Sequence, residues 1–381
     1  MSSGPDVSIK KHFGRLKDPR IDRTKLHKLL DILAIAICAV ICGADSWTEV
    51  AFFGRSKEEW FQTFLELPNG IPSHDTFGRL FAHLDPAQFE TCFLAWIGAI
   101  SDLVPGQVIP IDGKELRRSH DRSSGKAAIH MVSAWASANQ LVLGQVKVDD
   151  KSTEITAIPE LLKALALEGC IVTIDAIGCQ KEIAATIVDQ GADYVLALKE
   201  NQGNLYNDVV LLFDDLEHSA YQDYVYGTTK TMDKAHGRVD VRQCWTMAGR
   251  DTLRHLRGAE EWKSLQSVVK VRTERYLPEK TEIKNRYYIS SLKGEADQAL
   301  LVKRTHWSIE NSLHWVLDIA FREDESRVRK DHGPENFAIL RHIALNLLKQ
   351  AKSIKAGIKA KRLVAGWDEK YLLQVLSPLL N

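Results

Sequence analysis

Apolar and polar residues follow two different periods along this chain. Between about residues 22 and 100, apolar side chains recur every three or four positions, as in helices that bury one face. The pattern predicts an all-helical N-terminal domain over residues 21–104. Residues 1–20 lack this period and carry several Lys and Arg side chains, so we expect a flexible basic arm there. The predicted helices are 26–41, 46–65, 73–84 and 86–101.

The period changes at about residue 105, where apolar runs of strand length begin. Residues 108–113, 128–137 and 140–148 have the length and composition of three successive strands. Helical and strand-like segments then alternate, over 154–167, 170–176, 180–190 and 192–199. Three strands followed by helix, strand, helix and strand is the order of the ribonuclease H-like fold. We therefore predict an α/β protein whose residues 105–381 form a ribonuclease H-like mixed-sheet core.

Residues 201–299 interrupt this core. They contain several further strand-like runs that the minimal fold does not need, so we predict a β-rich insertion. Residues 300–381 return to the helical period and are expected to form C-terminal helices.

Composition and charge narrow the class of protein. The chain has 381 residues, of which 45% are hydrophobic and 26% are charged, as in ordinary globular proteins. Its net charge of zero excludes a uniformly basic surface, so nucleic-acid binding would need local basic patches. The apolar segment from Leu29 to Ala44 contains Asp31 and is shorter than the roughly 20 residues that span a bilayer. We expect no membrane association and a cytoplasmic location.

Two aspartates stand where apolar runs end. Asp112 closes the run VIPID, and Asp175 closes CIVTID. Such residues project into the crevice in which open α/β sheets bind ligands. A third carboxylate, Glu310, lies in the helical stretch 305–324. Mg²⁺ prefers carboxylate ligands, and a pair of such ions can clamp the attacking and leaving oxygens of a phosphodiester. An Asp after an apolar run is also commonly a loop residue or a helix cap.

The helix around Glu310 allows a different metal. His306, Glu310 and His314 are spaced four residues apart and share one stripe of the helix, which could hold zinc. A zinc hydrolase would leave Asp112 and Asp175 unexplained. Contacts to phosphate or to water are the better roles for His306 and His314.

Longer motifs carry a resemblance to a known family. In chain order, these segments resemble motifs of the H-repeat-associated transposases, a family of DDE transposases from bacterial insertion sequences: IPIDGKELRRS, TIDAIGCQKEIA, ADYVLALKENQ, AHGRVDVR and HWSIENSLHWVLDIAFREDESRVRKDHGPENFAILRHIALNLLK. The resemblance implies a ribonuclease H-like core in which Asp112, Asp175 and Glu310 form the catalytic, metal-binding triad. The implied cofactor is Mg²⁺, with Mn²⁺ as a substitute.

The resemblance also implies DNA as the partner, both at the terminal inverted repeats of the element and at the target. Related transposases contact DNA ends with a β-rich insertion, and Arg238 and Arg242 would share one face of a strand there. Joining two ends implies at least a homodimer in the DNA complex. The candidate DNA-contacting residues are Lys114, Arg117, His236, Arg238, Arg242, Arg304, His306 and His314.

The N-terminal helices offer a second candidate DNA contact. Ser73 is a plausible cap for helix 73–84, whose Thr76, Arg79 and His83 share a face. This helix could be the recognition helix of a helix-turn-helix unit. Equally, it could be one more member of a small bundle.

The chain departs from related transposases around Glu310. Positions that hold Tyr, Arg and Lys in many transposases with a β insertion are here Lys303, His306 and Leu317. Two alternatives to an active transposase therefore stay open. One is an inactive or domesticated descendant that binds DNA without cutting it, and the other is a sequence-tolerant, metal-dependent nuclease of the same fold.

Overall fold

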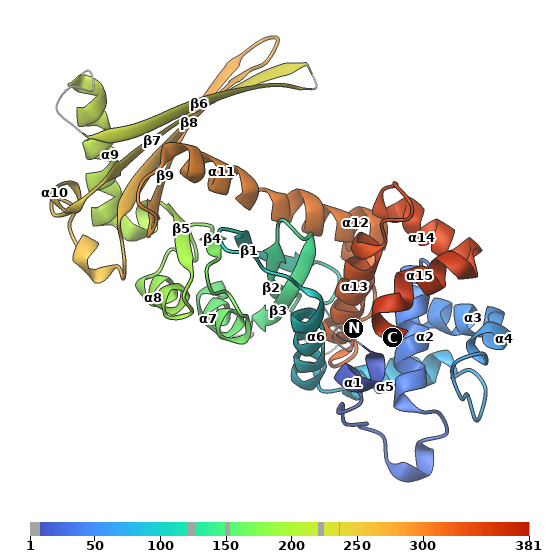
Figure 1. The fold of residues 1–381 in the computed structure, drawn as a ribbon. Coiled ribbons are helices and arrows are strands. Elements are labelled where there is room, and N and C mark those ends of the chain that lie inside the picture. The colour runs from blue at the N-terminus through green and yellow to red at the C-terminus, as the bar shows by residue number, and fades with distance from the viewer. Residues whose placement is uncertain (1–7, 121–126, 149–152, 220–224, 236, 381) are drawn as a thin grey trace, which may run out of the picture.

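A nine-stranded mixed sheet forms the centre of the protein in the computed structural model, which describes residues 8–120, 127–148, 153–219, 225–235 and 237–380 (Figure 1). The strands are β1 (Val108–Leu116), β2 (Ile129–Ala136), β3 (Leu141–Val148), β4 (Ile171–Ile174), β5 (Asp193–Leu198), β6 (Tyr226–Ala235), β7 (Arg238–Ala248), β8 (Ser267–Tyr276) and β9 (Thr281–Ser290). Their spatial order is β3-β2-β1-β4-β5-β9-β8-β7-β6.

The first five strands make the predicted core. β1, β2 and β3 form an antiparallel meander, and β4 and β5 run parallel to β1. Helices α7 (Glu154–Ala164) and α8 (Lys181–Asp189) cover one face of these strands, and α11 (Ala296–His306) crosses the other (Figure 1). Strands covered on both faces need continuous apolar runs, and Ile109, Ile111 and Val172 are fully buried. The ribonuclease H-like fold class is confirmed.

The insertion extends the same sheet. β9 pairs with β5 in antiparallel register, so β6 to β9 continue the core instead of folding beside it, and their far ends project beyond it (Figure 1). The short helix α10 (Arg250–Leu253) and the longer α9 (Gly203–His218) also belong to this region. Helix α9 is absent from the sequence prediction, although the burial of Leu205, Val209 and Phe213 follows a helical period.

The N-terminal helices share one hydrophobic core with the sheet region, because α2 (Leu29–Ile41) packs against the C-terminal helix α13 (Gly333–Gln350). The expected flexible arm is wrong for its described part: residues 9–13 form α1, and Phe13 is buried. Residues 1–7 lie outside the described residues. Among the described helices, none is both long and apolar enough to cross a membrane. The N-terminal helices are α1 (Ile9–Phe13), α2 (Leu29–Ile41), α3 (Trp47–Ser56), α4 (Glu58–Phe61), α5 (His74–His83) and α6 (Pro86–Ile100).

The helical stretch that carries Glu310 changes its winding at that residue. A π-helical turn, Glu310–His314, joins α11 to α12 (Trp315–Phe321). π turns are rare and frequently lie at functional sites. The chain then continues through a 3₁₀ turn, Glu323–Glu325, into α13, α14 (Ile358–Trp367) and α15 (Glu369–Leu380).

Candidate metal centre and basic groove

Three carboxylates from distant parts of the chain line one cavity. In the parallel pair β1 and β4, Ile111 lies beside Ile174, so the next residues, Asp112 and Asp175, follow at the same edge of the sheet. Glu310 reaches this edge from the π turn. All three line a cavity of about 370 Å³. The residues that the sequence singled out separately therefore meet in space.

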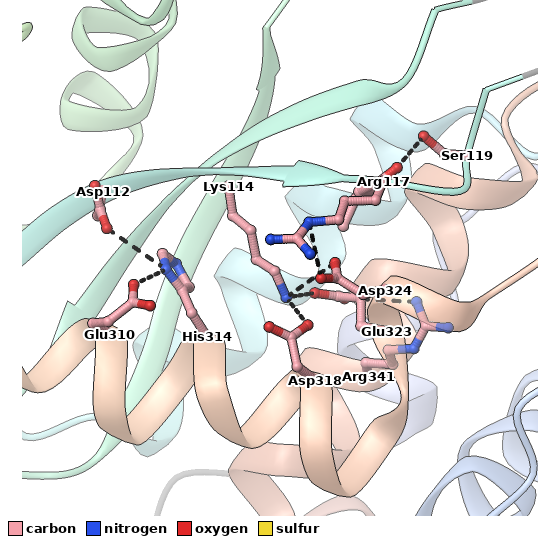
Figure 2. Close-up of polar contacts among 11 residues, drawn as sticks. Asp112, Lys114, Arg117, Ser119, Glu310, His314, Asp318, Glu323, Asp324 and Arg341 are labelled. Carbon is pink, nitrogen blue, oxygen red and sulfur yellow. Dashed lines mark hydrogen bonds and ion pairs between the residues drawn. The ribbon is translucent and has the colours of Figure 1, made fainter.

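His314 lies between two of these carboxylates. Its Nδ1 is 3.2 Å from Oε2 of Glu310 and 3.6 Å from Oδ2 of Asp112 (Figure 2). One ligand atom from each of these three residues lies within 4.8 Å of the others, which is close enough to hold one cation. Burial, reinforced by the nearby Lys114 ammonium, lowers the pKa of His314. A neutral imidazole that carries its proton on Nδ1 can therefore donate to the Glu310 carboxylate at neutral pH.

Negative charge accumulates at Asp112. Burial, followed by the neighbouring Asp175, raises the pKa of Asp112 to about 7, and Glu154 and Glu310 add to the effect. Carboxylates crowded in this way cost free energy when they are all ionised, and a bound divalent cation removes that cost. The donor set consists of hard carboxylate oxygens with one imidazole, which fits Mg²⁺ or Mn²⁺.

This crowding predicts a pH-dependent stability of the metal-free protein. Because the pKa of Asp112 rises from 3.8 in a model peptide to about 7 in the fold, the folded state binds the proton more tightly than the unfolded state. Stability is therefore lost as pH rises from about 4 to 7, by at most ~4 kcal/mol at ~1.4 kcal/mol per unit. We expect Asp112→Asn to abolish most of this loss and to be more stable than wild type at pH 8 by about 2 kcal/mol.

Urea unfolding at pH 5 and pH 8 in the presence of EDTA measures the difference. Addition of Mn²⁺ at pH 8 should stabilise wild type and leave Asp112→Asn nearly unchanged, since cation binding stabilises only a site that is intact. If the unfolding free energies of wild type and Asp112→Asn changed with pH in the same way, Asp112 would not be the source of the pH dependence.

Side chains also lie close to the backbone of β1 at Gly113, next to Asp112. His130 Nε2 lies 2.6 Å from Oε1 of Glu154, and a Cβ atom at Gly113 would stand 2.1 Å from that same oxygen. A larger residue at Gly113 would therefore require the Glu154 and His130 side chains to shift. The contribution of Glu154 to the charge at Asp112 has no sequence motif of its own.

His306 takes a place different from that of His314. Its Nδ1 lies 2.9 Å from the hydroxyl of Thr173 in β4, and burial lowers its pKa. It lines the carboxylate cavity but is not part of the group formed by Asp112, Glu310 and His314. The His306, Glu310, His314 stripe therefore does not form a zinc site among the described residues.

A second cavity of about 530 Å³ adjoins the first and shares Arg286, Lys303 and Trp307 with it. We call this second cavity the basic groove. Burial and the surrounding arginines lower the pKa of Lys303 to about 8, which reflects how densely cations gather there. The groove is lined by Arg238, Arg242, Thr273, Arg275, Glu282, Lys284, Arg286, Lys303, Arg304, Trp307 and Asn311.

Three of the predicted DNA contacts, Arg238, Arg242 and Arg304, lie in the basic groove. They are partly neutralised by acidic neighbours: Arg242 contacts Asp233 at 2.5 Å, and Arg304 contacts the same carboxylate at 3.0 Å. His236 lies outside the described residues. The strand β9 supplies two cations that the sequence analysis missed, Lys284 and Arg286, whose spacing of two places them on one strand face.

Lys114 and Arg117 lie away from the groove. The Lys114 ammonium contacts Asp318, lies 2.9 Å from Glu323 and 4.0 Å from Asp324 (Figure 2). Its side chain is 13% exposed, so its charge is already neutralised inside the protein. Arg117 pairs with Asp324 at 3.3 Å but stays 75% exposed. The structure removes Lys114 from the expected DNA contacts.

Comparison with known proteins agrees with this fold. Residues 104–347 match the family model described as Transposase DDE domain, and residues 10–97 match the model described as DDE_Tnp_1-associated. The chain belongs to the DDE transposases. Within them it belongs to the H-repeat-associated family, as the resemblance of its motifs indicated.

Two relatives from Escherichia coli match nearly the whole chain. The H repeat-associated putative transposase YhhI of strain K12 is 39% identical over 97% of this chain and 97% of its own length. Putative transposase YncI of O157:H7 is 39% identical over 97% of this chain and 94% of its own length. A solved structure of the piggyBac transposase synaptic complex with hairpin DNA aligns at 12% identity with a TM-score of 0.42, over 97% of this chain and 76% of that chain.

Proposed function

We propose that this DDE transposase is catalytically active, and that it hydrolyses phosphodiesters at the ends of its insertion sequence and joins the released 3′-hydroxyls to target DNA. The observation that carries this proposal is the continuity of two cavities. One is lined by Asp112, Asp175 and Glu310, and the other, which shares three residues with it, is lined by seven Lys and Arg side chains. A DNA strand bound along the cations would have a phosphate at the carboxylates.

The triad would hold Mg²⁺ or Mn²⁺, which when bound supplies positive charge to the phosphate and lowers the cost of the in-line displacement. Asp112 would have to lose its proton to hold the cation, because burial and the neighbouring Asp175 raise its pKa to about 7. Nδ1 of His314 lies between two of the triad carboxylates, 3.2 Å from Glu310 and 3.6 Å from Asp112. Arg286 and Lys303 line both cavities and would position the phosphate backbone.

The two reaction steps balance without a covalent enzyme intermediate. In the first, a water oxygen forms a bond to phosphorus at the element end, and the bond to the 3′-oxygen breaks, leaving a 3′-hydroxyl. In the second, that hydroxyl attacks a target phosphodiester and displaces a target 3′-oxygen. We expect at least two copies of the chain in the DNA complex, because two ends must be joined to one target.

A DNA-binding protein that no longer cuts is the second candidate. The departures at Lys303, His306 and Leu317 favour it, and Leu317 is 2% exposed, so this position cannot supply a phosphate contact. The presence of all three carboxylates in one cavity favours the active enzyme.

The test is cleavage and joining of a labelled duplex that carries the element's own terminal repeat, in Mg²⁺ or Mn²⁺, by wild type and Asp175→Ala in parallel. Repeat-specific nicking and joining that the variant lacks would support the active transposase. Binding of the repeat without metal-dependent cutting would identify a relic. Cutting that ignores the repeat would identify a general nuclease.

A further inference from the structure

Two rows of side chains face each other beside the metal centre. On β1, Asp112 and Lys114 are two residues apart and point to the same side of the strand. On the facing helix, Glu310, His314 and Asp318 are four residues apart and form one stripe. Two strand residues span ~6.6 Å and four helical residues span ~6 Å. Because these distances are nearly equal, successive residues of the two rows lie opposite each other. Figure 2 shows the result: Asp112 faces Glu310 across His314, and Lys114 faces Asp318.

The second of these contacts is anchored in the protein interior. Lys114 also binds Glu323, which is 2% exposed, and the other oxygen of Glu323 lies 3.6 Å from Nη1 of Arg341 in α13. Burial by itself would raise the pKa of Glu323, but the charges of Lys114 and Arg341 outweigh it and lower this pKa to about 2. The Glu323 carboxylate is therefore ionised. Loss of one partner from a buried charge cluster is strongly unfavourable. The contacts of Lys114, Glu323 and Arg341 therefore hold β1 in a fixed position against α12 and α13.

The π turn lies between α11 and the Asp318 contact. Such turns are rare and frequently lie at functional sites, and the anchor at Lys114 stands beside the one that carries Glu310 and His314. Metal ligands must be held to within about half an ångström of their working geometry.

We propose that Lys114 is a positioning residue for the metal centre: by binding Asp318 and Glu323 it fixes the register of the Glu310 helix against β1, and thus the separation of the Asp112 and Glu310 carboxylates. This inference rests on the proposed function of that triad. It replaces the expected contact between Lys114 and DNA.

Electrostatics alone predicts the opposite sign for the loss of Lys114. An ammonium near a cation site repels the cation, so removal of that charge should strengthen cation binding. Positioning predicts weaker binding. The direction of the change therefore separates the two roles.

The experiment is Mn²⁺ binding to the DNA-free protein, followed by electron paramagnetic resonance of the free ion. We expect Lys114→Met to raise the Kd for Mn²⁺ by about ten-fold or more, the effect typical of residues that orient metal ligands. The matched control is Lys147→Met, since Lys147 on β3 pairs with Glu335 of α13 at 3.2 Å and contacts no triad carboxylate among the described residues. Lys147→Met should keep the wild-type Kd.

Lys114→Arg covers the case in which Lys114→Met does not fold. Arginine keeps the charge but not the point geometry of the ammonium, so electrostatics predicts no change and positioning predicts a Kd raised by about three-fold or more. A wild-type or tighter Kd in either folded variant would overturn the proposal. If wild type shows no Mn²⁺ binding that Asp112→Asn removes, the metal triad itself fails, which is a different outcome from intact binding that is indifferent to Lys114.

Discussion

Replacement of Glu310 by Gln is expected to reduce DNA cleavage by about a thousand-fold or more and to leave DNA affinity nearly unchanged. The amide keeps the shape of the side chain and an oxygen for His314 Nδ1, but it lacks the negative charge that a divalent cation requires. The Glu310 side chain is 55% exposed, so the change should not disturb the core. Single-turnover cleavage in Mg²⁺ and fluorescence anisotropy of the same duplex measure the two quantities.

Glu325→Gln is the matched control for this prediction. Glu325 is similarly exposed, at 54%, and pairs with Arg322 away from the carboxylate cavity, so its loss should leave cleavage at the wild-type rate. Cleavage by Glu310→Gln within about ten-fold of wild type would remove Glu310 from the catalytic triad.

The double variant Lys284→Ala/Arg286→Ala is expected to weaken DNA binding by about a hundred-fold at low salt and to reduce the slope of log K against log salt by about two. Both side chains are exposed, lie on the same face of β9 and line the basic groove. Each would neutralise one phosphate and release about one counterion. Titration of a labelled duplex at several salt concentrations measures both the affinity and the slope.

Arg272→Ala tests whether position matters or only total charge. On β8, Thr273 and Arg275 line the groove, so the alternation of side chains places Arg272 on the opposite face of the strand. Arg272 pairs there with Glu274 at 2.9 Å. Its loss should change the salt slope little. If Arg272→Ala and the double variant lose the same salt slope per substituted residue, the groove is not the DNA path.

The order of strands and the two aspartates could be predicted because their signals are local. Apolar runs mark β1 and β4, and an Asp at the end of each run marks the sheet edge where ligands bind. The helical period around Glu310 was equally clear. Residues 9–13 were mistaken for a flexible arm because one short helix, with only Phe13 fully buried among its five residues, produces no period.

Helix α9 and the strand β9 show a different reason for error. The strand-like runs of the insertion predict only β structure there, and the helical period of α9 lies between them. On β9, Lys284 and Arg286 alternate as residues of an exposed strand face do, but exposed alternation does not show that such a face lines a groove.

The sequence by itself determined the fold class, the three carboxylates and the family, because strand and helix periods and long motifs are properties of neighbouring residues. The tertiary structure alone decided which charges are free. The resemblance places Lys114 and Arg117 among the expected DNA contacts, yet Asp318 and Glu323, about two hundred residues later, neutralise Lys114. His314 contacts Glu310 one helical turn away, but only the tertiary structure brings it to Asp112 on β1. The availability of a charge depends on its partners and its burial, and both are set by chain segments that sequence neighbours do not reveal.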